Sequence, residues 1–204
     1  AILHACKVLN PSGALSWIVM GIDWVLSNGV RPAIISMSLG APGVARAYNV
    51  AISAAVDKGI VVVVAAGNEN DDACKYGPAF VPKAITVGST TAPKGNKDPI
   101  SDFSNFGTCV DIFAPGSSIG SCTNRNDNGM TYKSGTSMAC PGVAGAAALV
   151  MAAYPGITAE DVDKKLKAHA TRIDIVGQNN VAKPNSPGLL LYVGQEWTAG
   201  SNCP

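Results

Sequence analysis

Apolar residues recur along the chain with two spacings, one typical of helices and one of strands. The stretch 15–26 places them three and four positions apart, which predicts a helix with one apolar face. The run 60–65, Ile-Val-Val-Val-Val-Ala, is typical of a strand buried on both faces of a parallel sheet. Further strands are predicted at 1–9, 33–37, 84–88, 110–113 and 189–193, and further helices at 45–58, 135–154 and 158–168. This order predicts a doubly wound α/β fold, a mostly parallel sheet with helices on both faces.

The length of 204 residues fits one domain, and the composition restricts its partners. Hydrophobic residues make up 47%, whereas 14% charged residues and a net charge of +1 create no basic field for nucleic acid. The longest apolar helical run, 143–154, is shorter than the ~20 residues of a membrane span. No segment resembles a signal peptide, so we expect the chain to begin after any targeting sequence or to lack the front of its domain. Neither nucleic acid nor a membrane is an expected partner.

The cysteine pattern bears on the cellular compartment. No Cys-x-x-Cys pair occurs and the chain has two histidines, which argues against a zinc site. An even number of cysteines fits disulfides in an oxidising compartment, and six buried thiols in a cytosolic protein are the alternative. The six are Cys6, Cys74, Cys109, Cys122, Cys140 and Cys203.

Three segments contain residues that could take part in binding or catalysis, and each lies at the end of a predicted strand or the start of a predicted helix. Ser137 lies at the mouth of a helix, with its hydroxyl exposed and its N–H free to donate, although a plain capping turn has the same pattern. Asn68 follows the most buried strand and could donate a hydrogen bond, or simply form a turn. The segment 36–40 could pair with an extended peptide or be an ordinary strand end. In this fold class, ligands bind at the carboxyl ends of the strands.

Together these segments resemble the subtilisin-like serine proteases, the subtilases. The segment 134–139, Ser-Gly-Thr-Ser-Met-Ala, resembles their nucleophile motif, and 65–68, Ala-Ala-Gly-Asn, resembles their oxyanion-hole motif. The segment 36–40, Ser-Met-Ser-Leu-Gly, resembles their substrate-pairing strand. Two more segments, 103–107 and 111–116, also resemble family segments in family order. The resemblance covers nearly the whole chain and is greatest to the proteinase K and aqualysin branch.

The resemblance implies a role for each matching residue. Ser137 would form the acyl-enzyme, while Asn68 and the backbone N–H of Ser137 would bind the oxyanion. Two further groups would bind substrate: Ser38, Leu39 and Gly40 along its backbone, and Ala65, Ala66 and Gly67 around the side chain before the scissile bond. The implied protein is a secreted endopeptidase acting on peptides or proteins. It would prefer apolar or aromatic side chains and need no cofactor for catalysis.

The same resemblance implies a disulfide and a structural metal ion. Cys74 and Cys109 match positions that are joined in aqualysin-like members. A calcium ion would be held by the carboxylate of Asp111 and the backbone carbonyls of Pro82 and Ala84, since calcium prefers hard oxygen ligands.

The chain departs from the family in lacking two motifs. Subtilases order their triad as Asp, His and Ser, and neither an Asp-Thr/Ser-Gly nor a His-Gly-Thr segment occurs here. Gly142 also stands where the family usually has a histidine. We therefore expect residues 1–204 to be the serine-bearing, C-terminal part of a catalytic domain, inactive alone. The acid and base would come from missing upstream chain or from a second chain.

Two alternatives remain beside this interpretation. An α/β-hydrolase would order its triad as Ser, acid and His, and would need His169 with Asp163 or Asp174. These residues leave little chain for the intervening elements, so we disfavour it. A catalytically inactive subtilase module that binds peptides or partner proteins is the second alternative. The only other histidine, His4, is expected to be structural.

Overall fold

The structure is a computed structural model that describes residues 1–10, 12–93, 99–177, 182–194 and 197. Four α-helices lie in this part of the chain: α1 (Leu15–Asn28), α2 (Arg46–Asp57), α3 (Thr136–Ala153) and α4 (Ala159–His169). The main sheet contains β1 (Ile34–Met37), β3 (Val61–Ala65), β5 (Ile85–Thr90), β6 (Ile112–Pro115), β10 (Leu189–Leu190) and β9 (Thr171–Arg172). Two small ribbons pair β2 (Ala41–Pro42) with β4 (Tyr76–Gly77), and β7 (Ile119–Cys122) with β8 (Met130–Lys133). A 3-10 turn, η1 (Ala73–Lys75), precedes β4.

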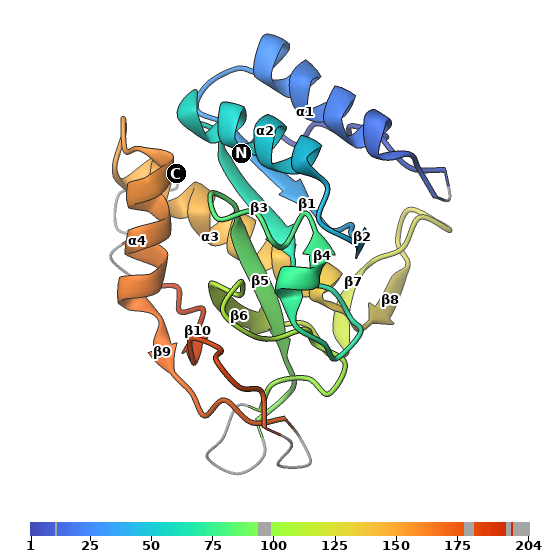
Figure 1. Ribbon diagram of the computed structural model, residues 1–204, viewed down its shortest axis with the longest axis vertical. Coiled ribbons are helices and arrows are strands. Elements are labelled where there is room, and N and C mark those ends of the chain that lie inside the picture. Colours follow the sequence, from blue (N-terminus) through green and yellow to red (C-terminus); the bar gives the residue numbers. More distant parts are fainter. Residues whose placement is uncertain (11, 94–98, 178–181, 195–196, 198–204) are drawn as a thin grey trace.

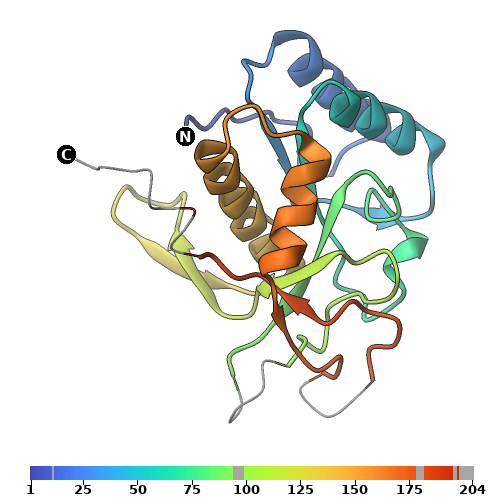
Figure 2. The ribbon, with the colours of Figure 1, turned by 90° about the vertical axis from the view of Figure 1, so that its left-hand side faces the viewer.

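The main sheet is parallel over most of its width. Its strand order is β1-β3-β5-β6-β10-β9, and only the last pair, β10 with β9, is antiparallel. Figures 1 and 2 show α1 and α2 together on one side of the sheet and α3 and α4 on the other. The chain therefore has the predicted doubly wound α/β architecture.

Alternate residues of β3 face two separate cores. Val61 and Val63 pack with residues of α3 and α4, whereas Val62 and Val64 pack with residues of α1 and α2. All five residues of the strand are buried. A strand with helices on both faces has no polar side, which explains why its sequence is apolar throughout.

Helix α3 is as long and apolar as a membrane span, a property that the shorter run 143–154 did not indicate. It nevertheless packs against β3 and β5, and Val143, Ala147 and Val150 on it are fully buried. Its many small residues let it lie close to the sheet. A central core helix of a globular domain has the same length and composition.

One predicted strand is wrong. Residues 1–9 form no strand, and Ile2 and Leu3 are almost fully exposed. A strand is stable only when its backbone groups pair with a neighbour, and this segment pairs with no strand in the described part of the chain. An apolar pattern alone therefore does not make a strand where no neighbouring strand is available to pair with it.

Candidate active site

Ser137 lies in the first turn of α3, where the backbone N–H groups of a helix have no intrahelical acceptor. Its side chain is half-buried, so it is not sealed in the core. The Ser137 hydroxyl donates a long hydrogen bond of 3.5 Å to the carbonyl of Ser38. In return, the Ser38 hydroxyl donates to the carbonyl of Ser137 at 2.8 Å. This pair joins the start of α3 to the segment that follows β1.

Asn68 is attached to the same helix through its carboxamide oxygen. Asn68 Oδ1 accepts a hydrogen bond of 2.8 Å from the backbone N–H of Thr136 and one of 3.1 Å from its hydroxyl. Thr136 Oγ1 in turn accepts from the backbone N–H of Gly67 at 3.2 Å. The two contacts fix the orientation of the amide, since its oxygen is held by Thr136 and its NH2 end remains the donor for a ligand.

The Asn68 carboxamide and the Ser137 N–H border one small space beside Gly135. A methyl group on Gly135 would lie 3.6 Å from Asn68 Oδ1, 3.7 Å from Asn68 Nδ2 and 3.6 Å from the Ser137 nitrogen. Glycine leaves this space open. Two nitrogen donors this close together beside a serine hydroxyl are groups that can stabilise negative charge on an oxygen bound between them.

The predicted catalytic and substrate-binding residues all line a single pocket of about 220 Å³. They come from the carboxyl ends of the parallel strands β1 and β3 and from the start of α3. The eight are Ser38, Leu39, Gly40, Ala65, Ala66, Gly67, Asn68 and Ser137. The fold thus brings them together, and their individual roles remain predictions. Glu69 and Tyr76 also line the pocket, and the resemblance did not point to either.

Asn105 supports the loop that carries Asn68, although its residue type gave no sign of this role. The side chain is fully buried. Its nitrogen donates to the carbonyl of Ala66 at 2.9 Å and to the Glu69 carboxylate at 2.8 Å. Its oxygen accepts from the N–H groups of Glu69 and Asp71, both at 3.0 Å. The only sequence signal was its place in the 103–107 segment of the family resemblance.

A buried lysine, Lys183, contacts the loop that follows Asn68 and the segment that carries Asn105. Lys183 is 1% exposed, and its ammonium donates to the carbonyls of Asp102 at 2.9 Å and Ser104 at 3.2 Å, and to the side chain of Asn70. Burial lowers the pKa of Lys183. Because its donors have oxygen acceptors, the charge does not lie in an apolar environment.

Neither histidine is placed to act as a base for Ser137. His4 is exposed in the irregular segment 1–9. His169 ends α4, where Nδ1 lies 2.9 Å from the carbonyl of Lys165 and the ring packs edge-on against Trp197 at 5.1 Å. His169 lines a different hollow, beside the connection between α3 and α4, and not the pocket of Ser137. The α/β-hydrolase alternative therefore finds no support.

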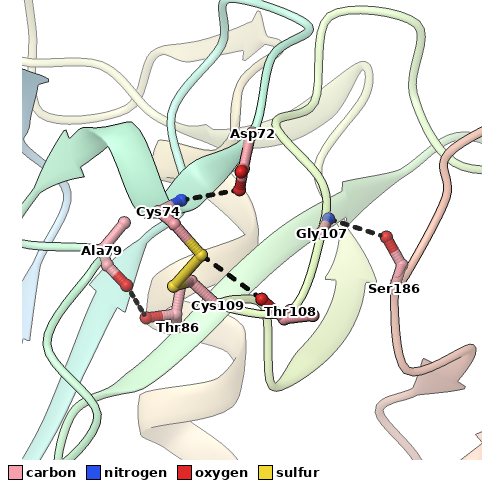
Figure 3. The surroundings of a disulfide bond; sticks show 8 residues. All are labelled: Asp72, Cys74, Ala79, Thr86, Gly107, Thr108, Cys109 and Ser186. Atoms are coloured by element: carbon pink, nitrogen blue, oxygen red, sulfur yellow. Dashed lines mark hydrogen bonds between the residues drawn. A yellow bond between two sulfur atoms is a disulfide. The ribbon is translucent and has the colours of Figure 1, made fainter.

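Two cysteines form the disulfide that the resemblance implies, and a third lies on α3 one turn after Ser137. Cys74 and Cys109 form a disulfide with a Cα–Cα distance of 5.2 Å, and Figure 3 shows it joining η1 to the loop before β6. Cys140 is a buried thiol, one turn after Ser137, and burial raises its pKa. Cys6 and Cys122 are exposed and form no disulfide with another described residue, and Cys203 lies outside the described residues.

The carboxylate expected to hold calcium has other contacts. Asp111 Oδ2 accepts a hydrogen bond of 2.8 Å from the backbone N–H of Thr86, and Oδ1 lies 2.7 Å from the ammonium of Lys167. Burial raises the pKa of the Asp111 carboxyl, and Lys167 opposes this rise. Pro82 and Ala84 lie in the turn before β5. No cluster of three or more His, Cys, Asp or Glu side chains occurs in the described ranges, so calcium remains a prediction.

Comparisons with known proteins identify the family of the chain. Residues 1–191 match the model of the subtilase family. The chain is 47% identical over 195 residues to an extracellular serine proteinase of Thermus sp. (strain Rt41A), covering 93% of this chain and 45% of that protein. It is 40% identical over 194 residues to alkaline serine exoprotease A of Vibrio alginolyticus, covering 95% of this chain and 34% of that protein.

A solved structure also matches. A cold adapted subtilisin-like serine proteinase superposes with a TM-score of 0.78 at 40% identity, covering 90% of this chain and 63% of that one. The chain thus spans less than half the length of the two curated relatives named above. Its family is nevertheless settled by the match over nearly all of its own residues: the chain belongs to the subtilase family.

Proposed function

We propose that this chain is the nucleophile-bearing part of a secreted serine endopeptidase that cleaves peptide bonds through an acyl-enzyme on Ser137. The observation that supports it best is that the Asn68 carboxamide and the Ser137 nitrogen lie close together beside Gly135. A peptide carbonyl placed there would meet the Ser137 hydroxyl and two donors for its developing negative charge. The names of the relatives, an extracellular serine proteinase and an alkaline serine exoprotease, support hydrolysis and secretion.

The proposed reaction needs a base, and none of the described residues places one beside Ser137. The hydroxyl donates to a backbone carbonyl, which is too weak a base to accept its proton. A histidine from upstream or separate chain would take that proton, and an aspartate from the same part would orient the histidine. Residues 1–204 alone would then retain at most the oxyanion hole and substrate binding, worth ~10³–10⁴ over water in such enzymes.

The open edge of the sheet supports a missing or separate part. Strand β1 is the edge of the main sheet and ends beside Ser38, next to the nucleophile. Strands added to this edge in parallel would also end near Ser137, because the carboxyl ends of parallel strands meet at one side of a sheet. Trp17, Met20 and Trp24 on α1 are more than half exposed, so apolar surface remains uncovered nearby.

The substrate-binding part of the proposal follows from the pocket. Ser38, Leu39 and Gly40 follow edge strand β1, where an extended peptide can pair with the backbone. The small side chains of Ala65, Ala66 and Gly67 leave room for an apolar or aromatic residue before the scissile bond. The alternative, an inactive module that binds peptides in the same cleft, needs no activated serine.

A fluorophosphonate reagent separates the two functions because it labels a serine rapidly only when a base lies beside it. We expect rapid labelling of Ser137 in the full-length natural protein, no labelling of its Ser137→Ala variant, and slow labelling of residues 1–204 alone. Intact-mass and peptide analysis would locate the adduct. An unlabelled natural protein that still binds peptides would establish the binding module instead.

A further inference from the structure

An ammonium group lies between two carboxylates on the side of the sheet covered by α4. Lys167 Nζ is 2.7 Å from Asp111 Oδ1, just before β6, and 2.7 Å from Asp163 Oδ2, one turn earlier on α4. The three side chains are between 24% and 31% exposed, so water screens this cluster less than a surface pair. The ion pair links α4 to the sheet across 56 positions of sequence.

This arrangement does not fit a calcium ion on Asp111. Calcium lies about 2.3–2.6 Å from its oxygen ligands and takes six to eight of them. An ion on Asp111 Oδ1 would therefore lie within roughly 5 Å of the Lys167 ammonium, because both would touch the same oxygen. The second oxygen already accepts the Thr86 N–H. A calcium ion on Oδ1 would compete with Lys167 for that oxygen, and displacing Lys167 would leave Asp163 without this partner.

The position of Lys167 on α4 also stabilises its positive charge beside the two carboxylates. Lys167 lies in the last turn of α4, where a positive charge interacts favourably with the helix dipole. Asp163 is four residues earlier on the same helix face, so the helix itself holds the two charges together. Asp163 Oδ1 is buried with no hydrogen-bond partner among the described residues, which leaves this carboxylate dependent on Lys167.

We propose that the ammonium of Lys167 is the cation of Asp111, in the place of the calcium ion that the family resemblance implies. The link between α4 and the β5–β6 region is then independent of calcium. The ammonium of Lys167 is covalently attached to the chain, whereas a calcium ion at this place could dissociate. Loss of calcium from the surroundings would leave this part of the fold intact.

The test compares thermal unfolding in millimolar calcium and in a chelator, using the full-length natural protein carrying Ser137→Ala to prevent self-digestion. We expect Asp111→Asn to leave the calcium response of the parent protein unchanged, because no calcium is bound to Asp111. We expect Lys167→Met, which keeps the apolar stem, to lower Tm in chelator by about 3–8 °C. It should also respond more strongly to calcium than the parent does, since Asp111 and Asp163 then need a cation.

Lys164→Met is the matched control. Lys164 lies on the same helix and pairs with Glu160 at 2.8 Å, also four residues earlier, but it is 63% exposed. We expect this variant to unfold like the parent. A parental calcium response that Asp111→Asn abolishes would overturn the proposal, and so would a Lys167→Met variant indistinguishable from Lys164→Met. If Lys167→Met fails to fold, the Asp111→Asn comparison still decides.

Discussion

Replacing Asn105 by alanine tests whether one buried carboxamide holds the oxyanion loop. The substitution removes four hydrogen bonds of 2.8–3.0 Å. The exposed Glu69 carboxylate can recover its bond from water, but the carbonyl of Ala66 is buried and the N–H groups of Glu69 and Asp71 are partly buried.

The expected loss follows from those three groups. A buried polar group left without a partner costs about 1–3 kcal/mol, and the two partly buried N–H groups cost near the lower end of that range, so the sum is roughly 3–5 kcal/mol, with a cavity in addition. This is a large share of the ~5–15 kcal/mol stability of a typical domain. At about 2–4 °C per kcal/mol, Tm should fall by roughly 6–20 °C.

Thermal unfolding followed by circular dichroism measures this loss in the full-length protein carrying Ser137→Ala. Asn28→Ala is the matched control, because Asn28 also donates one side-chain hydrogen bond, to the carbonyl of Trp24 at 2.9 Å, but is exposed. We expect the control to change the free energy of unfolding by less than about 0.5 kcal/mol. If Asn105→Ala were within about 1 kcal/mol of the control, the argument that Asn105 organises the loop would be wrong.

Three further perturbations test other parts of the account. Asn68→Ala in the active full-length protein should lower kcat by about 10²–10³-fold with a small change in KM, which is the magnitude known for the corresponding subtilisin donor. An unchanged kcat in steady-state kinetics would contradict the oxyanion role of Asn68. Replacing Cys74 and Cys109 together by serine should reduce the free energy of unfolding by about 4 kcal/mol, because the disulfide closes a loop with a sequence separation of 35. Denaturant titration measures this loss, and a loss below about 1 kcal/mol would show that the disulfide is unimportant for stability. Thr158→Ala should cost about 1 kcal/mol above pH 3.8, since Thr158 caps α4 and its hydroxyl lowers the pKa of Asp161. As the pH falls through that lowered pKa, the Asp161 carboxylate protonates in the folded state, so the difference between the two proteins should shrink, and a difference that grew in acid would refute the capping geometry.

The sequence allowed the core elements to be predicted because their signals are local. Residues 61–65 are apolar at every position, and a strand between two helical layers needs that pattern. Thr158 and Asp161 predicted the start of α4, and the structure contains both hydrogen bonds of the cap. In each case the residues that carry the signal also make the contacts.

Features that depend on distant partners were missed or wrong. Residues 1–9 have the composition of a strand but no neighbour to pair with in the described part of the chain. The β7–β8 ribbon was not predicted, because its strands are mostly exposed and joined by the polar stretch 123–129. Pairing of this kind depends on register across a turn and leaves a weak trace in hydrophobicity.

The same distinction applies to the site. Ser137 and Asn68 were identified through the family resemblance, and the structure places both at one pocket. The contacts of Asn105, Thr136 and Lys183 join segments far apart in the chain, so no local pattern could reveal them. Lys167 is an ordinary helix lysine by spacing, and only the fold brings Asp111 to it.

The most direct test of the account is a crystal structure of the full-length natural protein after reaction with a fluorophosphonate. We predict a phosphonyl group on the Ser137 oxygen. One phosphonyl oxygen should lie about 2.7–3.1 Å from both Asn68 Nδ2 and the backbone nitrogen of Ser137. An adduct whose oxygens point away from Asn68, or a protein that forms no adduct at Ser137, would contradict the proposed hydrolase.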